Sequence, residues 1–408
     1  RVSARCAIRT WYEMIKKQFG ELVLTPFRQT VTTKTVPDVT AAIRQSLQHS
    51  KIFQPVQAGD SVCIGIPSRG ISCMNAVLMA VIEELKARKA NPFLVPAMGS
   101  HGGGTAEGQQ QVLAGYGITQ TALGIPMKSD IEATLAGEMI LDGQLIPMYW
   151  DQFAAQADHV LVINRIKEHT AFTGPVESGL MKILALGLGK SQGARTLHQT
   201  DLSIAIPLAA QWLIKSYPIL GGIGIVENGL HQPMHIEAVP ASTLAIREPQ
   251  LLEKARASLP RIPFDELDVL IIGEMGKDIS GTGMDTNVIG KYRRNWGEAI
   301  PNYRCIVVLD LTDASHGNAT GVGFADIITR QLYDKIDLDA TRLNCLTARN
   351  FNGAKIPMIA EDEAQAINWA LQGLGKNARV VYVNSTLDLE TIWVSEALRS
   401  LRSPEAVR

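Results

Sequence analysis

The stretch that decides the fold is DSVCIGIPSRGISCMNAVLMAVIEELKARKA, residues 60–90. A short apolar run ends near Pro67, the chain turns at Ser68-Arg69-Gly70, and a segment with helical periodicity follows. A strand, a loop and an amphipathic helix in this order make a βα unit, from which parallel sheets are built. The stretch therefore predicts an α/β domain and places Arg69 in a loop that follows a strand.

The same pattern recurs along the chain, at residues 91–117, 157–172, 267–285 and 303–335, and residues 378–401 resemble a last strand with a closing helix. Ligands of open α/β sheets bind outside the carboxyl ends of the strands. The residues expected there are Arg69, His101, His169, Lys277 and Asp278.

A polar segment with three prolines, residues 247–267, predicts the domain boundary, because proline interrupts both strands and helices. We expect an N-terminal α/β domain over residues 1–258 and a C-terminal α/β domain over residues 264–390. Residues 391–408 are expected to form a helix that packs back on the first domain. The predicted fold class is two α/β domains with mostly parallel sheets flanked by helices, and with the active site in the interdomain cleft.

Composition narrows the classes of partner. The chain has 408 residues, of which 46% are hydrophobic, and a formal net charge of −1 with no basic stripe, which argues against nucleic acid. No apolar run reaches the roughly 20 residues of a membrane span. The five cysteines are scattered and odd in number, which argues against a disulfide framework or a zinc site and favours a reducing, cytoplasmic compartment. A small-molecule partner is favoured.

Phosphate-binding loops are the first chemistry to weigh, because the region around residue 182 is rich in glycine. A Walker A loop needs G-x-x-x-x-G-K-[ST]. GPVESGLMK, residues 174–182, has its lysine two positions late, and GLGKS, residues 187–191, has Leu184 where the first glycine is required. Nucleotide hydrolysis by this route is rejected.

Lys182 is unusual because it lies in the apolar run GLMKILALGLG, which contains no acidic partner. One interpretation is an exposed helical lysine whose stem packs on its neighbours. The other is a desolvated amine with a lowered pKa that can act as a nucleophile. Spacing alone favours the exposed lysine.

Several histidines lie in segments that suit a site. His101 lies among glycines, His169 follows a strand and His198 lies in RTLHQTD. His316, in ASHGNATG, is expected to line the second domain's side of the cleft. His231 and His235 have the spacing of a helical metal pair, but Pro233 lies between them, so a surface loop is expected.

Carboxylates give a weaker signal. Glu177 is a candidate acid or ligand, whereas Asp130 and Asp158 suit a loop cap and a strand edge. A serine nucleophile elbow, G-x-S-x-G, does not occur in the sequence.

Taken together, the segments PSRGIS, PAMGSHGGG, ADHVLVINRIKEHTAFTGPVESGLMK, RTLH and GEMGKDISGTGMD resemble the nickel-dependent lactate racemases and their 2-hydroxy acid racemase and epimerase relatives. The resemblance covers the chain from about residue 60 to 290. It implies two α/β domains with the active site between them. It also implies a nickel-pincer nucleotide, which is a pyridinium-3-thioamide-5-thiocarboxylic acid mononucleotide with Ni(II).

The resemblance assigns roles residue by residue. Lys182 resembles the lysine that holds the pincer covalently, and His198, sixteen positions later, resembles the histidine that binds nickel. His101 and His169 resemble the acid/base pair. The remaining implied contacts are Ser68, Arg69 and Gly174 to the cofactor, and Arg69, Lys277 and Asp278 to the substrate.

The implied function is racemisation or epimerisation of a 2-hydroxy acid by reversible hydride transfer to the lysine-linked cofactor. Two alternatives stay open: the same cofactor acting on a larger substrate such as a sugar acid, and a cofactor-free carboxylate-binding protein. Cofactor-synthesis proteins are the implied protein partners. The chain departs from the family in the longer interval between His169 and Lys182, which holds PVESGLM, and in its second domain, where Lys291 or Arg293 is the candidate for the missing substrate contact.

Overall fold

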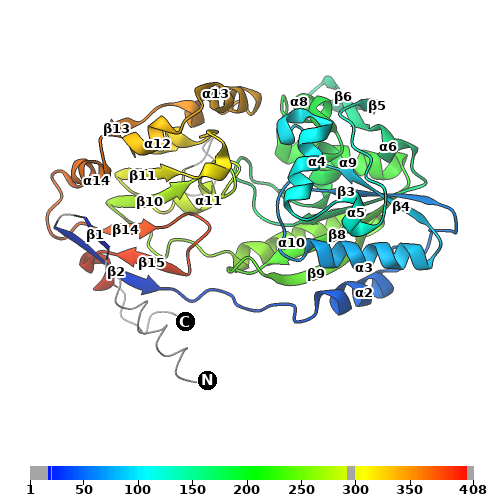
Figure 1. Ribbon diagram of the computed structural model, residues 1–408, viewed down its shortest axis with the longest axis horizontal. Coiled ribbons are helices and arrows are strands. Elements are labelled where there is room, and N and C mark those ends of the chain that lie inside the picture. The colour runs from blue at the N-terminus through cyan, green and yellow to red at the C-terminus, as the bar shows by residue number, and fades with distance from the viewer. Residues whose placement is uncertain (1–16, 20, 292–298, 402–408) are drawn as a thin grey trace. The chain divides into compact units, whose positions relative to one another are not determined.

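The computed structural model describes residues 17–19, 21–291 and 299–401. The chain divides into two compact units. The insert unit is Thr32–Leu259, and the flanking unit combines the chain up to Val31 with the chain from Pro260 onward. Figure 1 labels the elements of both units.

The insert unit is built on a five-stranded sheet with the order β4-β3-β7-β8-β9. Its first four strands are parallel and β9 runs antiparallel to β8. The strands are β3 (Ser61–Ile66), β4 (Asn91–Pro96), β7 (His159–Arg165), β8 (Ile219–Glu227) and β9 (Pro233–Pro240). The helices are α2 (Val39–Ser50), α3 (Met74–Ala87), α4 (Ala106–Gly115), α5 (Gln120–Leu123), α6 (Gln152–Gln156), α7 (Leu180–Lys182), α8 (Lys190–Leu197), α9 (Leu202–Ser216) and α10 (Leu244–Ser258).

Strand β8 shows why helices cover both faces of this sheet. Its sequence is ILGGIGIVE, and successive side chains point to opposite faces. Ile223 and Ile225 belong to the core that also contains residues of α2 and α3. Gly222 and Gly224 face the other way, where a Cβ would lie 2.9 Å from a Leu180 methyl and 3.4 Å from a Leu251 methyl. The glycines therefore let α7 and α10 lie close to the sheet.

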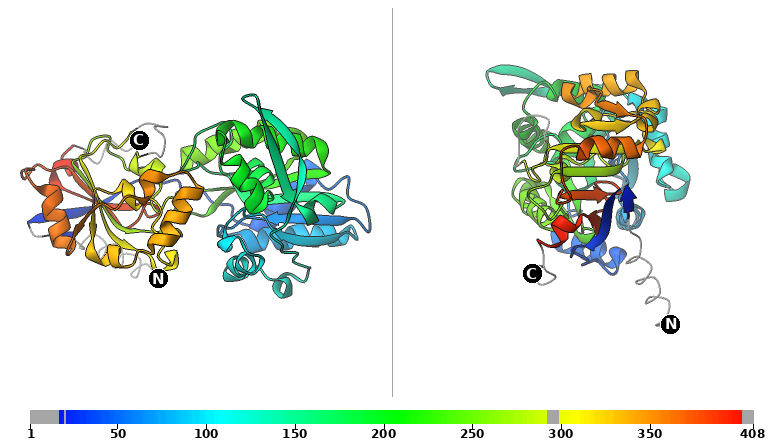
Figure 2. Two further views of the ribbon diagram at one scale, coloured as in Figure 1. Left: turned by 90° about the horizontal axis from the view of Figure 1, so that it is seen from above. Right: turned by 90° about the vertical axis from the view of Figure 1, so that its left-hand side faces the viewer.

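A hairpin of β5 (Ala133–Leu141) and β6 (Gln144–Asp151) forms a separate two-stranded sheet in the insert unit. Its tip is a tight turn in which Asp142 and Gly143 have positive φ, as a two-residue hairpin loop requires. Both views in Figure 2 show the hairpin extending away from the five-stranded sheet.

The flanking unit contains an eight-stranded sheet with the order β1-β2-β15-β14-β10-β11-β12-β13. Strands β14, β10, β11, β12 and β13 are parallel, and the other three are joined by antiparallel pairs. The strands are β1 (Lys17–Phe19), β2 (Leu22–Arg28), β10 (Val269–Met275), β11 (Cys305–Leu311), β12 (Ile327–Thr329), β13 (Met358–Ala360), β14 (Val380–Val383) and β15 (Thr391–Val394). The helices are α11 (Thr286–Ile289), α12 (Arg330–Asp334), α13 (Leu338–Thr347), α14 (Glu363–Leu371) and α15 (Glu396–Arg399).

The domain bounds differ from the expected ones at both ends of the chain. Strand β2 lies in the flanking unit, where Thr25–Arg28 pairs with β15, so this N-terminal strand does not belong with residues 32–258. Residues 391–394 form strand β15 rather than a helix, and α15 contacts β2 in the flanking unit. The physical reason is that β15 would be an unpaired edge without β2, and Leu24 fills the core beside it. Residues 402–408 lie outside the described part of the chain.

The segment predicted to hold the domain boundary, residues 247–267, is in large part helix α10, which continues through Pro249. Pro249 is the sixth residue of the helix, so only one main-chain hydrogen bond near its beginning is lost. Burial of four side chains on one face offsets that loss: Leu244, Leu251, Leu252 and Ala255. The boundary itself falls at Leu259/Pro260, close to the expected place.

The structure confirms a mixed α/β fold with mostly parallel sheets flanked by helices. Four cysteines, Cys63, Cys73, Cys305 and Cys345, are free and buried, and Cys6 lies outside the described residues. Within residues 17–19, 21–291 and 299–401, no helix is both long and apolar enough to cross a membrane.

Candidate functional site

The strand order of the insert unit brings three loops to one edge of its sheet. Strand β3 lies between β4 and β7, and all three are parallel, so the loops after them emerge side by side. Ser68 and Arg69 follow β3, His101 follows β4, and Lys167 and His169 follow β7. The chain passes from β3 to β4 on one side and returns to β7 on the other, which is the switch point where ligands of such sheets bind.

Ser68 and His101 are in direct contact, because the Ser68 hydroxyl is hydrogen-bonded to His101 Nδ1. The His101 loop is shaped by glycine: Gly102 has φ of 65°, and a Cβ there would lie 2.7 Å from Gln109 N. Gln109 is 1% exposed, and its amide donates to the carbonyls of Gly99 and His101 at 3.0 and 3.3 Å. A buried side chain of α4 thus holds the loop that carries an expected acid/base residue.

Three cations, Arg69, Lys167 and Lys182, interact electrostatically, and we call them the cation group. Lys182 is half-buried. Burial and, after it, the charges of Arg69 and Lys167 lower the pKa of Lys182 to about 8. A minor fraction of the Lys182 amine, about a tenth at pH 7, is therefore uncharged and able to react, and the group as a whole suits an anionic ligand.

Lys182 lies at the end of α7, which runs into a π-helical turn over Ile183–Gly187. π-helical turns are rare and are often found at functional sites. The beginning of α7 is held from other elements: Met181 N donates to Glu248 Oε2 at 2.9 Å, and Asn164 Nδ2 donates to Gly179 O at 2.9 Å. A Cβ at Gly179 would lie 2.0 Å from Glu248 Oε1, so a larger residue there would displace the Glu248 carboxyl group. Burial raises the pKa of Glu248 to about 8.

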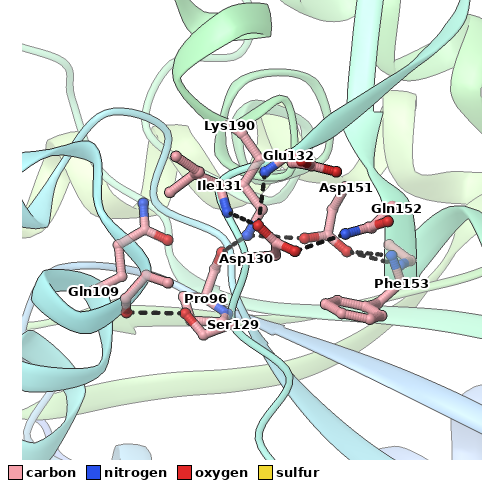
Figure 3. Close-up of polar contacts among 12 residues, drawn as sticks. Pro96, Gln109, Ser129, Asp130, Ile131, Glu132, Asp151, Gln152, Phe153 and Lys190 are labelled. Carbon is pink, nitrogen blue, oxygen red and sulfur yellow. Dashed lines mark hydrogen bonds and ion pairs between the residues drawn. The ribbon is translucent and has the colours of Figure 1, made fainter.

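A second lysine of this region, Lys190, is buried together with an acidic partner. Lys190 is 0% exposed and adopts a positive φ of 53°. Its ammonium donates to Pro96 O at 2.9 Å and pairs with Asp151 Oδ2 at 2.8 Å (Figure 3). The other oxygen of Asp151 caps α6 by accepting from Phe153 N and Ala154 N. Lys190 therefore links the end of β4 to the beginning of α6, a structural role that agrees with the rejection of GLGKS as a phosphate loop.

Glu177 and Gly174 lie in the loop that begins at His169. Glu177 is 2% exposed and accepts hydrogen bonds from His169 N at 2.5 Å and Gly174 N at 3.2 Å. Arg256 of α10 pairs with Glu177 at 2.6 Å and donates to Gly174 O at 3.3 Å. Glu177 thus ties the loop rather than facing a ligand, and the expected contact of Gly174 with a cofactor stays a prediction.

His198 is the C-cap of α8, where its N donates to Ala194 O at 3.0 Å, and the residue is half-buried. Across the described parts of the chain, no group of three or more His, Cys, Asp or Glu side chains could hold a metal ion. His198 as a nickel ligand stays a prediction that depends on ligands from a cofactor.

Lys277 and Asp278 lie in the flanking unit, after β10. Lys277 Nζ donates to Gly281 O at 2.7 Å and to Asn344 Oδ1 at 2.8 Å, and Asp278 accepts from the Thr312 hydroxyl at 2.5 Å. These contacts organise the loop after β10, and the expected roles in substrate binding stay predictions. A Cβ at Gly276 would lie 2.1 Å from Thr312 Oγ1, which explains glycine at that position.

Other residues that the sequence singled out lie outside the three loops at the edge of the sheet. Asp130 accepts from Ile131 N and Glu132 N as a loop cap (Figure 3), and Asp158 accepts from Ser61 at the start of β3, so both predictions are confirmed. His235 lies on β9 rather than in a loop, and pairs with Glu237 at 2.7 Å. His316 is exposed and has a φ of 46°. Lys291 donates to Phe324 O at 3.0 Å, and Arg293 lies outside the described residues.

Sequence reasoning missed Lys167, Gln109, Glu248 and Arg256. Lys167 follows a strand by two residues, which is a signal that could have been used. Glu248 and Arg256 lie on a helix that is distant along the chain from the segments they contact, so only the folded structure brings them together. Gln109 is also helical but contacts a loop that is near it in the sequence.

Comparisons with known proteins add one firm result. No family model and no curated protein sequence matches the chain. Among solved structures, the lactate racemase apoprotein from Thermoanaerobacterium thermosaccharolyticum is similar, with a TM-score of 0.55 and 12% identity over 92% of this chain and 99% of that one. At this identity the similarity establishes a shared fold.

The two expected halves of the site lie in different units. The insert unit contains Ser68, Arg69, His101, His169, Gly174, Lys182 and His198, and the flanking unit contains Lys277 and Asp278. An active site in a cleft between the domains stays a prediction.

Proposed function

We propose that this protein is a racemase or epimerase of a 2-hydroxy acid that uses a nickel-pincer nucleotide attached to Lys182. The observation that carries the proposal is the lowered pKa of Lys182 within the cation group, on a unit whose sheet edge also presents His101 and His169. The shared fold with a lactate racemase apoprotein supports the same reaction class.

The residues of the insert unit fit such a cofactor. An amine forms a covalent bond to a carbon only in its uncharged form, and a pKa of about 8 makes that form available to Lys182 near neutral pH. Arg69 and Lys167 suit the negative charge of a nucleotide. His198 offers an imidazole, a ligand that nickel accepts. When bound, the cofactor would supply an acceptor for the hydrogen on the substrate's 2-carbon as hydride.

The chain's own residues would bind the substrate and move a proton. Arg69 would hold the substrate carboxylate through paired hydrogen bonds. His101 and His169 would each take the 2-hydroxyl proton of one enantiomer and return it, since imidazole exchanges protons readily near neutral pH. The Ser68 hydroxyl bonded to His101 Nδ1 would orient that ring.

The test is to produce the protein together with cofactor-synthesis proteins, digest it and weigh the peptide that contains Lys182. We expect a mass increase on Lys182, one nickel per chain and interconversion of enantiomers in a panel of 2-hydroxy acids. Lys182→Arg keeps the positive charge but cannot form the link, so it should lose the added mass and the nickel. An unmodified Lys182 in a nickel-free wild-type protein would contradict the proposal.

The cation group also favours one function of another class, binding of a carboxylate without any cofactor. Calorimetric titration of the cofactor-free protein with 2-hydroxy acids and sugar acids separates the two. In the binding function His101→Ala leaves affinity largely intact and turnover never appears, whereas in the racemase function His101→Ala of the nickel-containing protein lowers turnover by about a hundredfold or more. Turnover of sugar acids but not of smaller 2-hydroxy acids would favour the alternative in which the same cofactor acts on a larger substrate.

A further inference from the structure

The loop that carries His169 is closed at its base and tied across its middle. Lys167 and Ser178 pair through their main chains, with N to O distances of 2.9 and 3.2 Å. Above this base, the Glu177 carboxylate accepts from His169 N through one oxygen and from Gly174 N through the other. One buried side chain therefore determines the position of the main chain at His169.

Arg256 links this carboxylate to helix α10. Its Nη2 contacts Glu177 Oε1 at 2.6 Å and Gly174 O at 3.3 Å, and its Nε lies 3.8 Å from Glu168. Its Nη1 pairs with Glu253, whose side chain is 67% exposed. Burial raises the pKa of Glu177, and the hydrogen bonds from His169 N, Gly174 N and the Arg256 guanidinium act against that rise and so favour the charged carboxylate.

The His169 ring has a contact of its own that depends on its proton. Ala171 N donates to His169 Nδ1 at 3.0 Å, and the ring stacks on Phe172 with 4.3 Å between centroids. A nitrogen that accepts a hydrogen bond carries no proton, so the neutral ring has its proton on Nε2. When the ring becomes doubly protonated, Nδ1 turns into a donor and the bond from Ala171 is lost. This bond can therefore hold His169 in only one protonation state.

We propose that Glu177, held by Arg256, is a positioning residue that keeps the His169 main chain in place in both protonation states of the imidazole. The bonds of Glu177 go to main-chain N–H groups, which do not change when the ring gains or loses a proton. The proposal rests on the proposed function for the acid/base role of His169. It does not depend on the identity of the substrate.

The test compares Glu177→Gln with Glu253→Gln and Arg256→Lys. A glutamine can accept through only one of its two atoms, so one of the two main-chain N–H groups is left without its acceptor. We expect amide hydrogen exchange at residues 169–174 to become about tenfold to a hundredfold faster in Glu177→Gln. Glu253→Gln removes only the exposed partner of Arg256 and should leave exchange unchanged. Arg256→Lys keeps the charge but not both contacts and should fall between them.

Two further measurements separate positioning from general structure. In protein labelled with ¹⁵N-histidine, and with His169→Gln used for assignment, the His169 signals should report the Nε2–H tautomer in the wild type and a mixture in Glu177→Gln. In the nickel-containing enzyme, kcat should fall by about tenfold with a shifted pH profile, while KM changes little.

Unchanged exchange at residues 169–174 and an unchanged tautomer in Glu177→Gln would overturn the proposal, whatever the activity. If Glu177→Gln loses protection throughout the strands of the insert unit, the same two measurements are made on Arg256→Lys instead. Unchanged exchange and an unchanged tautomer in Arg256→Lys would then overturn the proposal. Absence of any turnover in the wild type would contradict the proposed function. The exchange and tautomer measurements would still test whether Glu177 positions the His169 main chain.

Discussion

At the scale of single residues, Lys182 is the position that the structure clarifies most. The sequence left two interpretations, an exposed lysine and a desolvated amine. The residue is half-buried, and the charges of Arg69 and Lys167 add to the effect of burial. The nearby Lys190 shows the contrast: it is fully buried but paired with Asp151, which compensates its charge. At Lys182, by contrast, burial and the like charges of Arg69 and Lys167 both disfavour the charged amine.

This difference predicts how Lys182 reacts with an acylating reagent in cofactor-free protein. Labelling should rise with pH through a midpoint near 8, because only the uncharged amine reacts. Arg69→Gln removes a nearby positive charge, which stabilises the protonated form of Lys182 and raises its pKa. Labelling at pH 7.5 should then slow by roughly three- to tenfold. Peptide mass spectrometry measures the rates.

Lys89, an exposed lysine of the same unit, provides the internal control, and its labelling should be equal in both proteins. If Arg69→Gln leaves the rate at Lys182 unchanged, the charge of Arg69 does not contribute to the lowered pKa of Lys182.

At the scale of elements, helix α10 supports the candidate site although it contributes no residue that was expected there. Glu248 holds the beginning of α7, which carries Lys182, and Arg256 holds Glu177, which ties the His169 loop. The two residues are eight positions apart, about two turns, so they lie on one side of the helix. Much of the segment that was predicted to hold the domain boundary thus supports two parts of the candidate site.

The buried carboxyl of Glu248 predicts a pH-dependent stability. Its pKa rises from the ordinary 4.5 to about 8 on folding, so the folded chain holds the proton more tightly than the unfolded chain between these values. The free energy of unfolding should therefore fall as pH rises from about 4.5 to 8, by at most about 1.4 kcal/mol per pH unit from this group. Glu248→Gln has no such proton and should lack this decline. Urea unfolding at several pH values measures it.

Glu253→Gln is the matched control on the same helix, since the Glu253 side chain is 67% exposed. Its stability should follow the wild type at every pH. Parallel profiles for wild type and Glu248→Gln would show that Glu248 is already charged in the folded protein.

At the scale of the whole molecule, the first two described strands, β1 and β2, and the last described strand, β15, belong to the same sheet. Strand β2 pairs with β15 near the C-terminus, and the insert unit lies between the two parts of the flanking unit in sequence. Leu24 of β2 is 0% exposed and packs in a core with Val269, Val380 and Trp393. The N-terminal strand is therefore part of the flanking unit's core.

We expect Leu24→Ala to destabilise the flanking unit by about 2–5 kcal/mol, through lost burial and the cavity that remains. Hydrogen exchange should accelerate in β14 and β15 and stay unchanged in β3 and β7. Val23→Ala, one position away and 41% exposed in the wild type, should have little effect. Equal effects of the two substitutions, or a loss of protection in β3 and β7, would contradict this assignment of the N-terminal strand.

Much of the architecture could be read from the sequence, because the signals are local. The run from Ser61 to Ile66, the turn at Ser68-Arg69-Gly70 and the periodic segment after it predict β3, its loop and α3 without reference to other parts of the chain. The same reasoning placed His101 and His169 after strands. Proline signals were less reliable, since Pro249 lies inside a helix that burial stabilises.

The sequence by itself determined the α/β class, the βα units and the loops in which Arg69, His101 and His169 lie, because hydrophobic periodicity and turn residues act over short distances along the chain. Only the tertiary structure decided how those loops are held. Glu177 and Arg256 are 79 positions apart, and Met181 and Glu248 are 67 apart. Burial and neighbouring charges, which raise the pKa of Glu248 and lower that of Lys182, exist only once the helices are packed on the sheet.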